Sequence, residues 1–255
     1  MRQMQQEREE EARPALLELS GVGHRFPGAS KPVFENIDLS IANGEFVAVV
    51  GGSGVGKSTL LRNIAGLLPP SEGSIVYNGE QQQGRRNLAV VFQDGRLLPW
   101  RSLAGNIEFG LEGLGLSADE RNRRIEQVLE LTRIGELKDR WPHQLSGGQA
   151  QRGGIARALV VQPDLLLMDE PFSAVDAITR QVLQDELLRI WQASDAAVLF
   201  VTHDIHEAVL LADRVVVMGG QPGRITRDTK VDLARPRRRD DVNLFRLASD
   251  IAASI

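Results

Sequence analysis

Wholly apolar runs of four or five residues recur along the chain, and segments with helical periodicity lie between them. The runs at residues 46–50, 165–168 and 197–201 contain no polar residue. Strands with no polar alternation are typical of a parallel sheet that is covered on both faces. Helical spacing places on one face the residues Leu183, Leu187, Ile190 and Trp191. Because strands and helices alternate, we expect an α/β core.

The regions around these runs have other patterns. Residues 1–13 are almost all polar or charged, which predicts a disordered leader. Residues 16–19 and 37–41 are expected to be strands, and Asn43-Gly44 predicts a hairpin turn into the strand at 46–50. Between about residues 95 and 155 no run resembles a buried strand. Ser117 and Glu120 there fit a capping box that opens a helix, so this stretch is predicted to be a helical insert.

Composition excludes several kinds of site. The chain has 30 basic and 34 acidic residues, a net charge of -4, and this balance gives no electrostatic footprint for nucleic acid. It has no cysteine and four scattered histidines, so disulfides and thiolate metal sites are excluded. The amino terminus lacks the apolar core of a secretory signal. Apolar runs such as residues 196–201 are far shorter than the roughly 20 residues of a membrane span, and we expect a soluble chain.

A glycine-rich loop follows the first of the apolar strands. Residues 51–58 match G-x-x-x-x-G-K-[ST], and residues 59–68 continue with helical spacing. Backbone N–H groups of such a loop bind phosphate oxygens at the positive end of a helix dipole. We predict that Lys57 reaches the β- and γ-phosphates and that Ser58 binds Mg²⁺. An unrelated glycine-rich turn is disfavoured, because the strand and the helix are both in place.

An acidic pair ends the apolar strand at residues 165–168. Asp169 is placed to hold the Mg²⁺ site, and Glu170 is placed to polarise a water for attack on the γ-phosphate. Alone, such a pair is usually a solvated loop. Together with a phosphate loop it predicts nucleotide hydrolysis.

Residues 145–149 read LSGGQ. Ser146 and Gln149 fit a capping box, and the two glycines expose backbone N–H groups at a helix start, so a second anion-binding helix terminus is predicted. A capped helix without a ligand is the alternative. A phosphate loop, LSGGQ and an acidic pair in this order resemble the ATPases of ABC transporters. The resemblance covers about residues 16–230 and implies ATP hydrolysis with Mg²⁺.

The fold that this resemblance implies is a P-loop NTPase ABC cassette: a RecA-like α/β core, an antiparallel β subdomain and a helical insert. We divide the chain accordingly into a leader at 1–13, a first part of the ATP-binding core with the β subdomain at 14–94, a helical subdomain with the signature at 95–155, a second core part at 156–230 and a C-terminal tail at 231–255.

The resemblance also implies roles for single residues. Gln93 matches the glutamine that touches Mg²⁺, Asp176 lies in the loop that crosses a dimer interface, and His203 matches the histidine that contacts the γ-phosphate. Phe26 is placed like the aromatic residue that stacks on adenine, although a lone aromatic near a strand is more often part of a core. The catalytic residues are then Glu170, His203 and Gln93, and the metal ligands are Ser58, Gln93 and Asp169. The implied ATP-binding residues are Phe26, Gly51, Gly52, Ser53, Gly54, Val55, Gly56, Lys57, Ser58 and Thr59, and the residues implied to bind the ATP of a second subunit are Leu145, Ser146, Gly147, Gly148 and Gln149.

The implied partners are a second ATP-binding subunit, most simply an identical copy, and an integral membrane permease. Leu97, Leu98 and Trp100 follow Gln93 and are either a permease contact or part of the helical insert. The permease would place the chain at the cytoplasmic face of the inner membrane, and a periplasmic solute-binding protein would act with it indirectly.

The segments 91–100 and 106–111 resemble the nitrate, sulfonate and taurine importer branch, and within it we favour aliphatic sulfonate or taurine. Nitrate, bicarbonate or another small solute, a non-transport ABC ATPase and a nucleotide sensor without turnover are the alternatives. The sequence lacks the long coiled-coil insertions and second cassette of non-transport members, and it contains the residues needed for turnover.

Two segments depart from the expected pattern. Gly153-Gly154 lies inside the predicted signature helix, where each glycine costs about 1 kcal/mol relative to alanine. The helix is then either locally weak or packed closely against a neighbour. Arg235 to Arg239 includes four arginines but is followed by Asp240 and Asp241, and we expect a solvated loop there.

Overall fold

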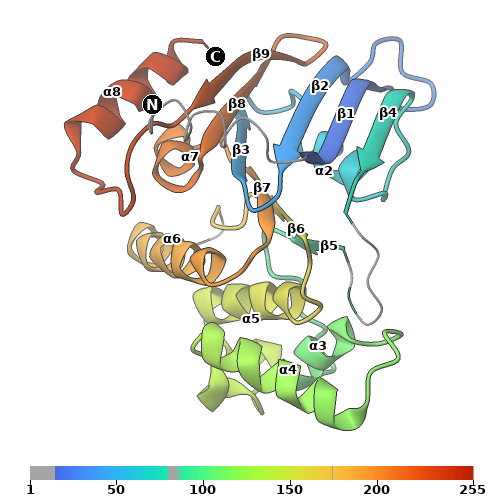
Figure 1. Ribbon diagram of the computed structural model, residues 1–255, viewed down its shortest axis with the longest axis vertical. Helices are drawn as coiled ribbons and strands as arrows, with labels where there is room; N and C mark the ends of the chain where they lie inside the picture. Colours follow the sequence, from blue (N-terminus) through green and yellow to red (C-terminus); the bar gives the residue numbers. More distant parts are fainter. Residues whose placement is uncertain (1–14, 80–84, 86, 174, 255) are drawn as a thin grey trace, which may run out of the picture.

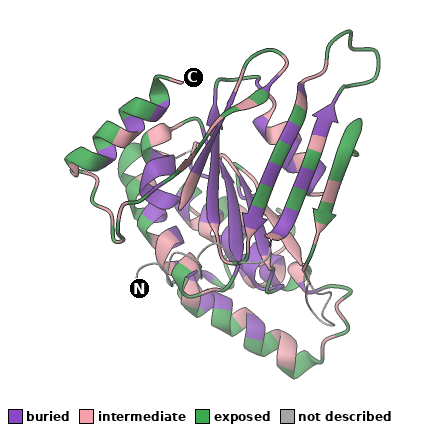
Figure 2. Ribbon diagram, turned by 45° about the horizontal axis from the view of Figure 1, so that its top comes forward, coloured by how far each residue is buried: buried purple, intermediate pink, exposed green. Residues whose placement is uncertain are grey.

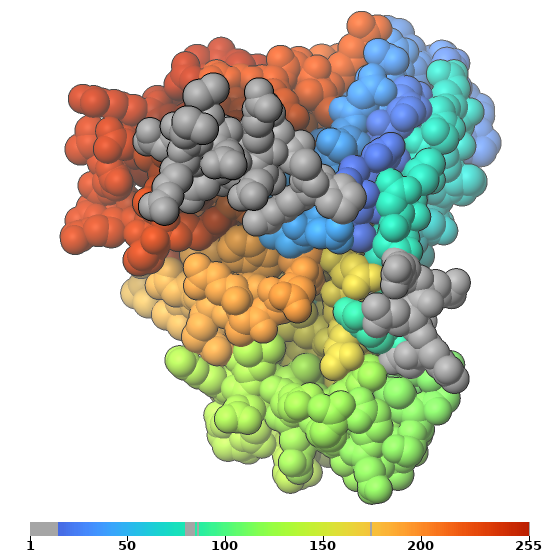
Figure 3. Space-filling view, viewed as in Figure 1, coloured from blue at the N-terminus to red at the C-terminus, as the bar shows by residue number. Residues whose placement is uncertain are grey.

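The computed structural model of the protein describes residues 15–79, 85, 87–173 and 175–254. The leader expected at residues 1–13 lies outside the described residues, and the division into domains remains a prediction. Figure 1 shows two sheets side by side at one end of the molecule and a group of helices at the other. Figure 3 shows the same division in the molecular surface, where α3 (Leu103–Gly110) and α4 (Ala118–Leu131) form one end of the molecule.

A six-stranded sheet with the order β5-β6-β7-β3-β8-β9 forms the centre of the core. The first five strands are parallel, and β9 pairs antiparallel with β8. Its strands are β3 (Phe46–Gly51), β5 (Leu88–Val91), β6 (Leu165–Asp169), β7 (Ala197–Val201), β8 (Arg214–Gly219) and β9 (Arg224–Lys230). The three apolar runs are therefore confirmed as the neighbouring strands β6, β7 and β3, and Figure 2 shows them buried.

A separate antiparallel sheet has the order β2-β1-β4. Its strands are β1 (Ala15–His24), β2 (Phe34–Ala42) and β4 (Glu72–Tyr77). The predicted hairpin at Asn43-Gly44 is wrong. The turn forms, with Gly44 at φ 68° and the Glu45 N–H bound to the Ala42 carbonyl, but β2 and β3 belong to different sheets. Exposed and buried residues alternate along β2, whereas every residue of β3 is buried, so the two strands need different surroundings.

The helices of the described residues include some that cover the six-stranded sheet on both faces, and α3 and α4, which lie at the far end of the molecule. The helices are α2 (Lys57–Ile64), α3 (Leu103–Gly110), α4 (Ala118–Leu131), α5 (Gly147–Leu159), α6 (Ala177–Gln192), α7 (Ile205–Leu211) and α8 (Val242–Ala252), with short 3-10 helices at Gly135–Leu137 and Pro142–Gln144. Successive residues of β3 serve two hydrophobic cores. Phe46, Ala48 and Val50 face the core shared with α3, α5, α6, α7 and α8, and Val47 and Val49 face the core shared with β1, β2 and α2.

The predicted helix start at Ser117 is confirmed in α4, but only the Ser117 half of the predicted capping box forms. The Ser117 side chain accepts a hydrogen bond from the Glu120 N–H, with 3.2 Å between the heavy atoms. The Glu120 carboxylate accepts hydrogen bonds from Arg123 and Arg124, so it stabilises the first turns of the helix through side chains. None of the helices in the described part of the chain is both long and apolar enough to cross a bilayer.

The expectation of a solvated loop at Arg235 to Arg239 is wrong. Arg237 is half-buried and donates hydrogen bonds to the carbonyls of Val209, Leu210 and Ala212 at the end of α7, and to those of Val231 and Leu233. The last carbonyls of a helix have no partner within it, so a guanidinium there satisfies them and meets the negative end of the helix dipole. Burial lowers the pKa of Arg237 to about 10. The tail is therefore fastened to the core.

Arg237→Met should lower the free energy of unfolding by about 2–4 kcal/mol, because a half-buried charged donor is lost and several carbonyls lose their partner. Arg238→Met is the matched control, since Arg238 is exposed and pairs only with Asp240 among the described residues, and it should leave the stability unchanged. Urea unfolding followed by circular dichroism measures both. Equal stability of the two variants would contradict the role assigned to Arg237.

Candidate functional site

The predicted phosphate loop lies between the end of β3 and the start of α2. Lys57 is the first residue of α2 and is buried, and its Nζ donates to the carbonyls of Gly51 at 2.8 Å and Gly52 at 3.0 Å. The N-cap residue is Gly56, which has no side chain to cap the helix. The first N–H groups of α2 are thus available to an anion. Burial lowers the pKa of Lys57, and the carboxylates of Glu170 and Asp169 oppose that shift.

Two glycines of this loop are required by close contacts. Gly51 has φ 152°, and a Cβ there would lie 2.1 Å from the Met218 carbonyl oxygen of β8. Gly56 has φ 106°, and a Cβ there would lie 2.8 Å from the Phe34 ring and 2.9 Å from the Val33 side chain. The loop is therefore pressed onto β8 and onto the start of β2. The sequence pattern did not identify these supporting residues, since apolar side chains in strands carry no signal for a site.

The acidic pair lies beside the phosphate loop. The Ser58 hydroxyl donates to Asp169 Oδ1 at 2.7 Å. Glu170 has φ 46°, a conformation that non-glycine residues rarely adopt, and its N–H binds the Val201 carbonyl at 2.9 Å. Its Oε2 lies 3.1 Å from His203 Nδ1. Lys57, Ser58, Asp169, Glu170 and His203 thus gather at the carboxyl ends of the parallel strands β3, β6 and β7, the edge at which open α/β sheets bind ligands.

The oxygen donors of this site fit Mg²⁺. Ser58 and Asp169 supply a hydroxyl and a carboxylate, which are hard ligands. Within the described residues no group of three or more His, Cys, Asp and Glu side chains forms a complete metal site. A metal at Ser58 and Asp169 would therefore need further oxygens, as when Mg²⁺ is shared between protein and nucleotide phosphates.

The LSGGQ segment forms the predicted capping box at the start of α5. The Ser146 N–H donates to Gln149 Oε1 at 2.9 Å, and the Gln149 N–H donates to Ser146 Oγ at 3.3 Å. Ser146 and Gly147 are exposed, Leu145 is half-buried, and Gly148 packs against Thr179 of α6. Within the described residues, no hydrogen bond joins this terminus to the phosphate loop of the same chain. It is a second helix start with free N–H groups.

The loop that carries Gln93 is held by α5. Gln93 itself is exposed. Arg157 donates to the carbonyls of Arg96 at 2.7 Å and Gly95 at 2.8 Å, and Gln151 Nε2 donates to the Phe92 carbonyl at 3.3 Å. The sequence pattern missed Gln151 and Arg157, because polar residues on a helix usually face solvent.

Gly153 and Gly154 are explained by close packing of the helix and not by local weakness. A Cβ at Gly154 would lie 2.9 Å from both the Cα and the carbonyl oxygen of Gly95. A Cβ at Gly153 would lie 2.6 Å from the Leu103 side chain and 3.3 Å from that of Leu97. The loop after Gln93 and the signature helix are therefore in direct backbone contact.

Three further residues predicted for the site are Phe26, Thr59 and Asp176. Phe26 is 42% exposed and packs edge-on against His24, with ring centroids 4.8 Å apart. His24 contacts Asn63 of α2, so Phe26 lies on the side of the phosphate-loop helix and outside the core. Thr59 is half-buried in the first turn of α2. Asp176 is exposed and caps α6, and hydrogen bonds from Thr179 lower the pKa of its carboxyl. Ala174, within the same loop, lies outside the described residues.

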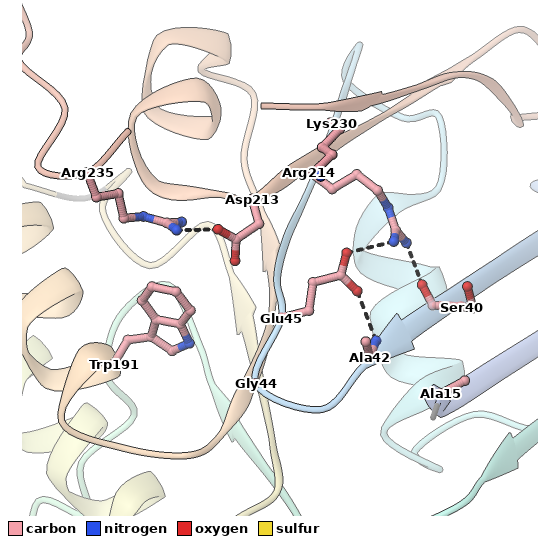
Figure 4. A pocket seen from close by; sticks show the side chains of 10 residues that line it. All are labelled: Ala15, Ser40, Ala42, Gly44, Glu45, Trp191, Asp213, Arg214, Lys230 and Arg235. Atoms are coloured by element: carbon pink, nitrogen blue, oxygen red, sulfur yellow. Dashed lines mark hydrogen bonds and ion pairs between the residues drawn. The ribbon is translucent and has the colours of Figure 1, made fainter. Parts of the chain in front are cut away.

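A cavity of about 570 Å³ lies at the other end of the strands from the phosphate loop. Figure 4 shows that Glu45, Asp213, Arg214 and Arg235 line it and that their charges are paired. Glu45 precedes β3, and Asp213 accepts a hydrogen bond from the first N–H of β3, so this cavity is at the amino ends of the strands. Burial raises the pKa of Glu45. Residues of both sheets line the cavity, and none of the predicted site residues is among them.

Comparisons with known proteins agree with this geometry. A family profile described as ABC transporter matches residues 34–173, a range that includes the phosphate loop, Gln93, the LSGGQ segment and the acidic pair. A dimeric ATP-binding cassette solved in a post-hydrolysis state with ADP and phosphate is similar in structure, with a TM-score of 0.71 and 30% sequence identity, over 86% of this chain and all of that one. The predicted fold class is thereby confirmed.

Curated relatives match most of the chain. The taurine import ATP-binding protein TauB of Pseudomonas syringae is 45% identical over 222 residues, which are 87% of this chain and 85% of the relative. The aliphatic sulfonates import ATP-binding protein SsuB 1 of Mesorhizobium japonicum is 47% identical over 231 residues, which are 91% of this chain and 85% of the relative.

Gly154→Ala should destabilise the protein by about 1–2 kcal/mol, since the cost of overpacking against the Gly95 backbone exceeds the gain in helix propensity. Gly153→Ala is the matched control. Its new methyl group meets the ends of leucine side chains, which can rotate, so its free energy of unfolding should stay within about 1 kcal/mol of the wild type. Thermal unfolding compares the two, and a Gly154→Ala variant as stable as Gly153→Ala would show that the contact with Gly95 is not tight.

Proposed function

The chain belongs to the ABC transporter family and is an ATPase, and we propose that it energises an importer of taurine or another aliphatic sulfonate. The observation that carries the proposal is the assembly of Lys57, Ser58, Asp169, Glu170 and His203 at one sheet edge, together with a second anion-binding helix terminus at Ser146. Two phosphate-binding termini in one chain are best explained by two copies that share two ATP molecules.

In this proposal each residue has a defined role. The N–H groups of residues 52–58 and Lys57 hold the phosphates, and Ser58, Asp169 and Gln93 hold Mg²⁺, which supplies charge neutralisation of the phosphate oxygens. Glu170 accepts a proton from the attacking water, and its strained backbone keeps its carboxylate close to His203. His203 contacts the γ-phosphate. Phe26, half-exposed on the side of α2, stacks on adenine.

The second terminus acts on the ATP of the partner copy. Ser146 and Gly147 are exposed, so the Ser146 hydroxyl and the Gly147 N–H can meet the γ-phosphate that is held by another chain. ATP then joins two copies into a closed dimer. Hydrolysis of ATP releases the γ-phosphate that both copies contact, and the dimer reopens. Asp176, exposed at the start of α6, lies at the same interface.

Exposed aromatic side chains support docking of a membrane permease. Trp100, Phe109 and Trp141 are 68%, 40% and 43% exposed. The carbonyl of Arg140 accepts a hydrogen bond from the Leu103 N–H, so Trp141 lies near the start of α3, as Trp100 does. Leu97 packs into the core in part, and Trp100 does not. Large exposed aromatic groups on one end of a protein are typical of a partner site.

The permease places this subunit on the cytoplasmic face of the inner membrane, and a periplasmic binding protein delivers the solute. The choice of taurine or an aliphatic sulfonate rests on the relatives, since an ATPase subunit has no contact with the solute. Nitrate and other small anions are the competing solutes.

Mixing two inactive variants tests the shared site. Lys57→Ala and Ser146→Ala should each lower phosphate release at least about a hundredfold, because each removes a contact to the transferred phosphate. In a 1:1 mixture half of the dimers are mixed, and each mixed dimer has one complete site of two, so about one quarter of the wild-type rate should return. A mixture no more active than its components would place Lys57 and Ser146 at the same ATP of one chain.

The growth of cells on different sulfur sources tests the choice of solute. Cells that lack this gene should fail to grow with taurine or an alkanesulfonate as the sulfur source, and the wild-type gene should restore growth. Glu170→Gln should not restore it, because the attacking water loses its base. Growth with sulfate is the control. Normal growth of the deletion strain on every sulfonate would refute this choice of solute.

A further inference from the structure

Three buried polar side chains meet between α6 and α7. Gln184, Thr202 and Glu207 are 5%, 2% and 6% exposed. Glu207 accepts hydrogen bonds from Gln184 Nε2 at 2.8 Å and from Thr202 Oγ1 at 2.5 Å, one on each carboxylate oxygen. A buried carboxylate is costly and is found where its hydrogen bonds fix one arrangement of the surrounding chain.

The arrangement that Glu207 fixes is the backbone around His203. Thr202 donates its hydroxyl proton to Glu207, and the same oxygen accepts the Asp204 N–H at 3.0 Å. Asp204 Oδ1 in turn accepts the Glu207 N–H at 3.2 Å. The residues on both sides of His203 are thus tied to one carboxylate. The His203 side chain is 60% exposed, so its flanking residues, and not its own packing, determine where it lies.

Gln184 connects this arrangement to α6. Its Oε1 accepts a hydrogen bond from Arg239 at 3.2 Å, which orients the amide so that its NH₂ group faces Glu207. Gln184 lies about two turns from Asp176, the residue that caps the start of α6. A shift of α6 would therefore change the hydrogen bond to Glu207 and, through Thr202, the position of His203.

We infer that Glu207 and Gln184 are positioning residues for ATP hydrolysis. They hold His203 against Glu170, and they make its position depend on the helix that begins at the dimer interface. This inference rests on the proposed role of His203. Neither residue contacts the reacting atoms, and both act through Thr202.

An exchange of the two side chains tests the inference. Gln184→Glu alone brings two carboxylates together, and Glu207→Gln alone leaves one amide hydrogen facing a donor. In the double variant the new amide at position 207 donates to the new carboxylate at position 184 and accepts from Thr202. The second oxygen of the carboxylate at position 184 still accepts the hydrogen bond from Arg239. Every hydrogen bond of the cluster is thereby restored, and only the bond between positions 184 and 207 has its donor and acceptor exchanged.

Each single substitution should lower kcat for ATP about tenfold and change KM less than about twofold, since it weakens an interaction made during turnover and not in binding. The double variant should recover kcat to within about threefold of the wild type. In a His203→Ala background the single substitutions should lower kcat no further, because their effect passes through His203. Gln192→Glu is the control and should keep the wild-type kcat, since Gln192 is an exposed residue at the end of α6.

Wild-type kcat in both single variants would overturn the inference. So would a double variant that regains the wild-type melting temperature but remains as slow as the single variants, or losses that multiply with His203→Ala. If the single variants do not fold, Thr202→Val removes the same link with a smaller change, and it must lower kcat at unchanged KM. The wild-type rate in this assay tests the proposed function separately, since the inference concerns only ratios to that rate.

Discussion

The parallel pairing of β3, β6 and β7 is the constraint on which the site depends. Parallel strands end at the same edge, and here their carboxyl ends lead into the phosphate loop, the acidic pair and the loop of His203. Residues more than a hundred positions apart, such as Ser58 and Asp169, come within hydrogen-bonding distance for this reason. The burial of all six residues of β3 fixes the phosphate loop firmly, because the strand cannot slide without exposing one of two cores.

Much of this arrangement could be predicted from the chain. Apolar runs without alternation identified the central strands, and glycines, lysine and carboxylates at strand ends identified the chemistry. The order of the strands and the pairing of β2 could not be read in the same way. A turn such as Asn43-Gly44 fixes the local backbone, but the choice of sheet is made by the burial of residues on either side.

Some supporting residues carried no signal. Arg237 belongs to a run of charged residues that usually faces solvent, and its role depends on carbonyls more than twenty positions away. Gln184 and Glu207 are ordinary polar residues on helices, and only the packing of α6 beside α7 turns them inward. The sequence showed that Gly153 and Gly154 depart from the expected pattern of a helix. The need for a glycine at position 154 comes from the close approach of the Gly95 backbone. Such contacts are set by tertiary structure and not by local pattern.

The attachment of the tail changes what counts as the smallest functional unit. A shortened chain that ended at Lys230 would retain every sequence motif of the cassette. It would also lack the guanidinium that closes the carbonyl end of α7 and the arginine that orients Gln184. The His203 loop would then be joined to a helix with a loose terminus. A minimal cassette chosen by its motifs alone would be too short, since residues after Lys230 hold the helix and the glutamine that support the His203 loop.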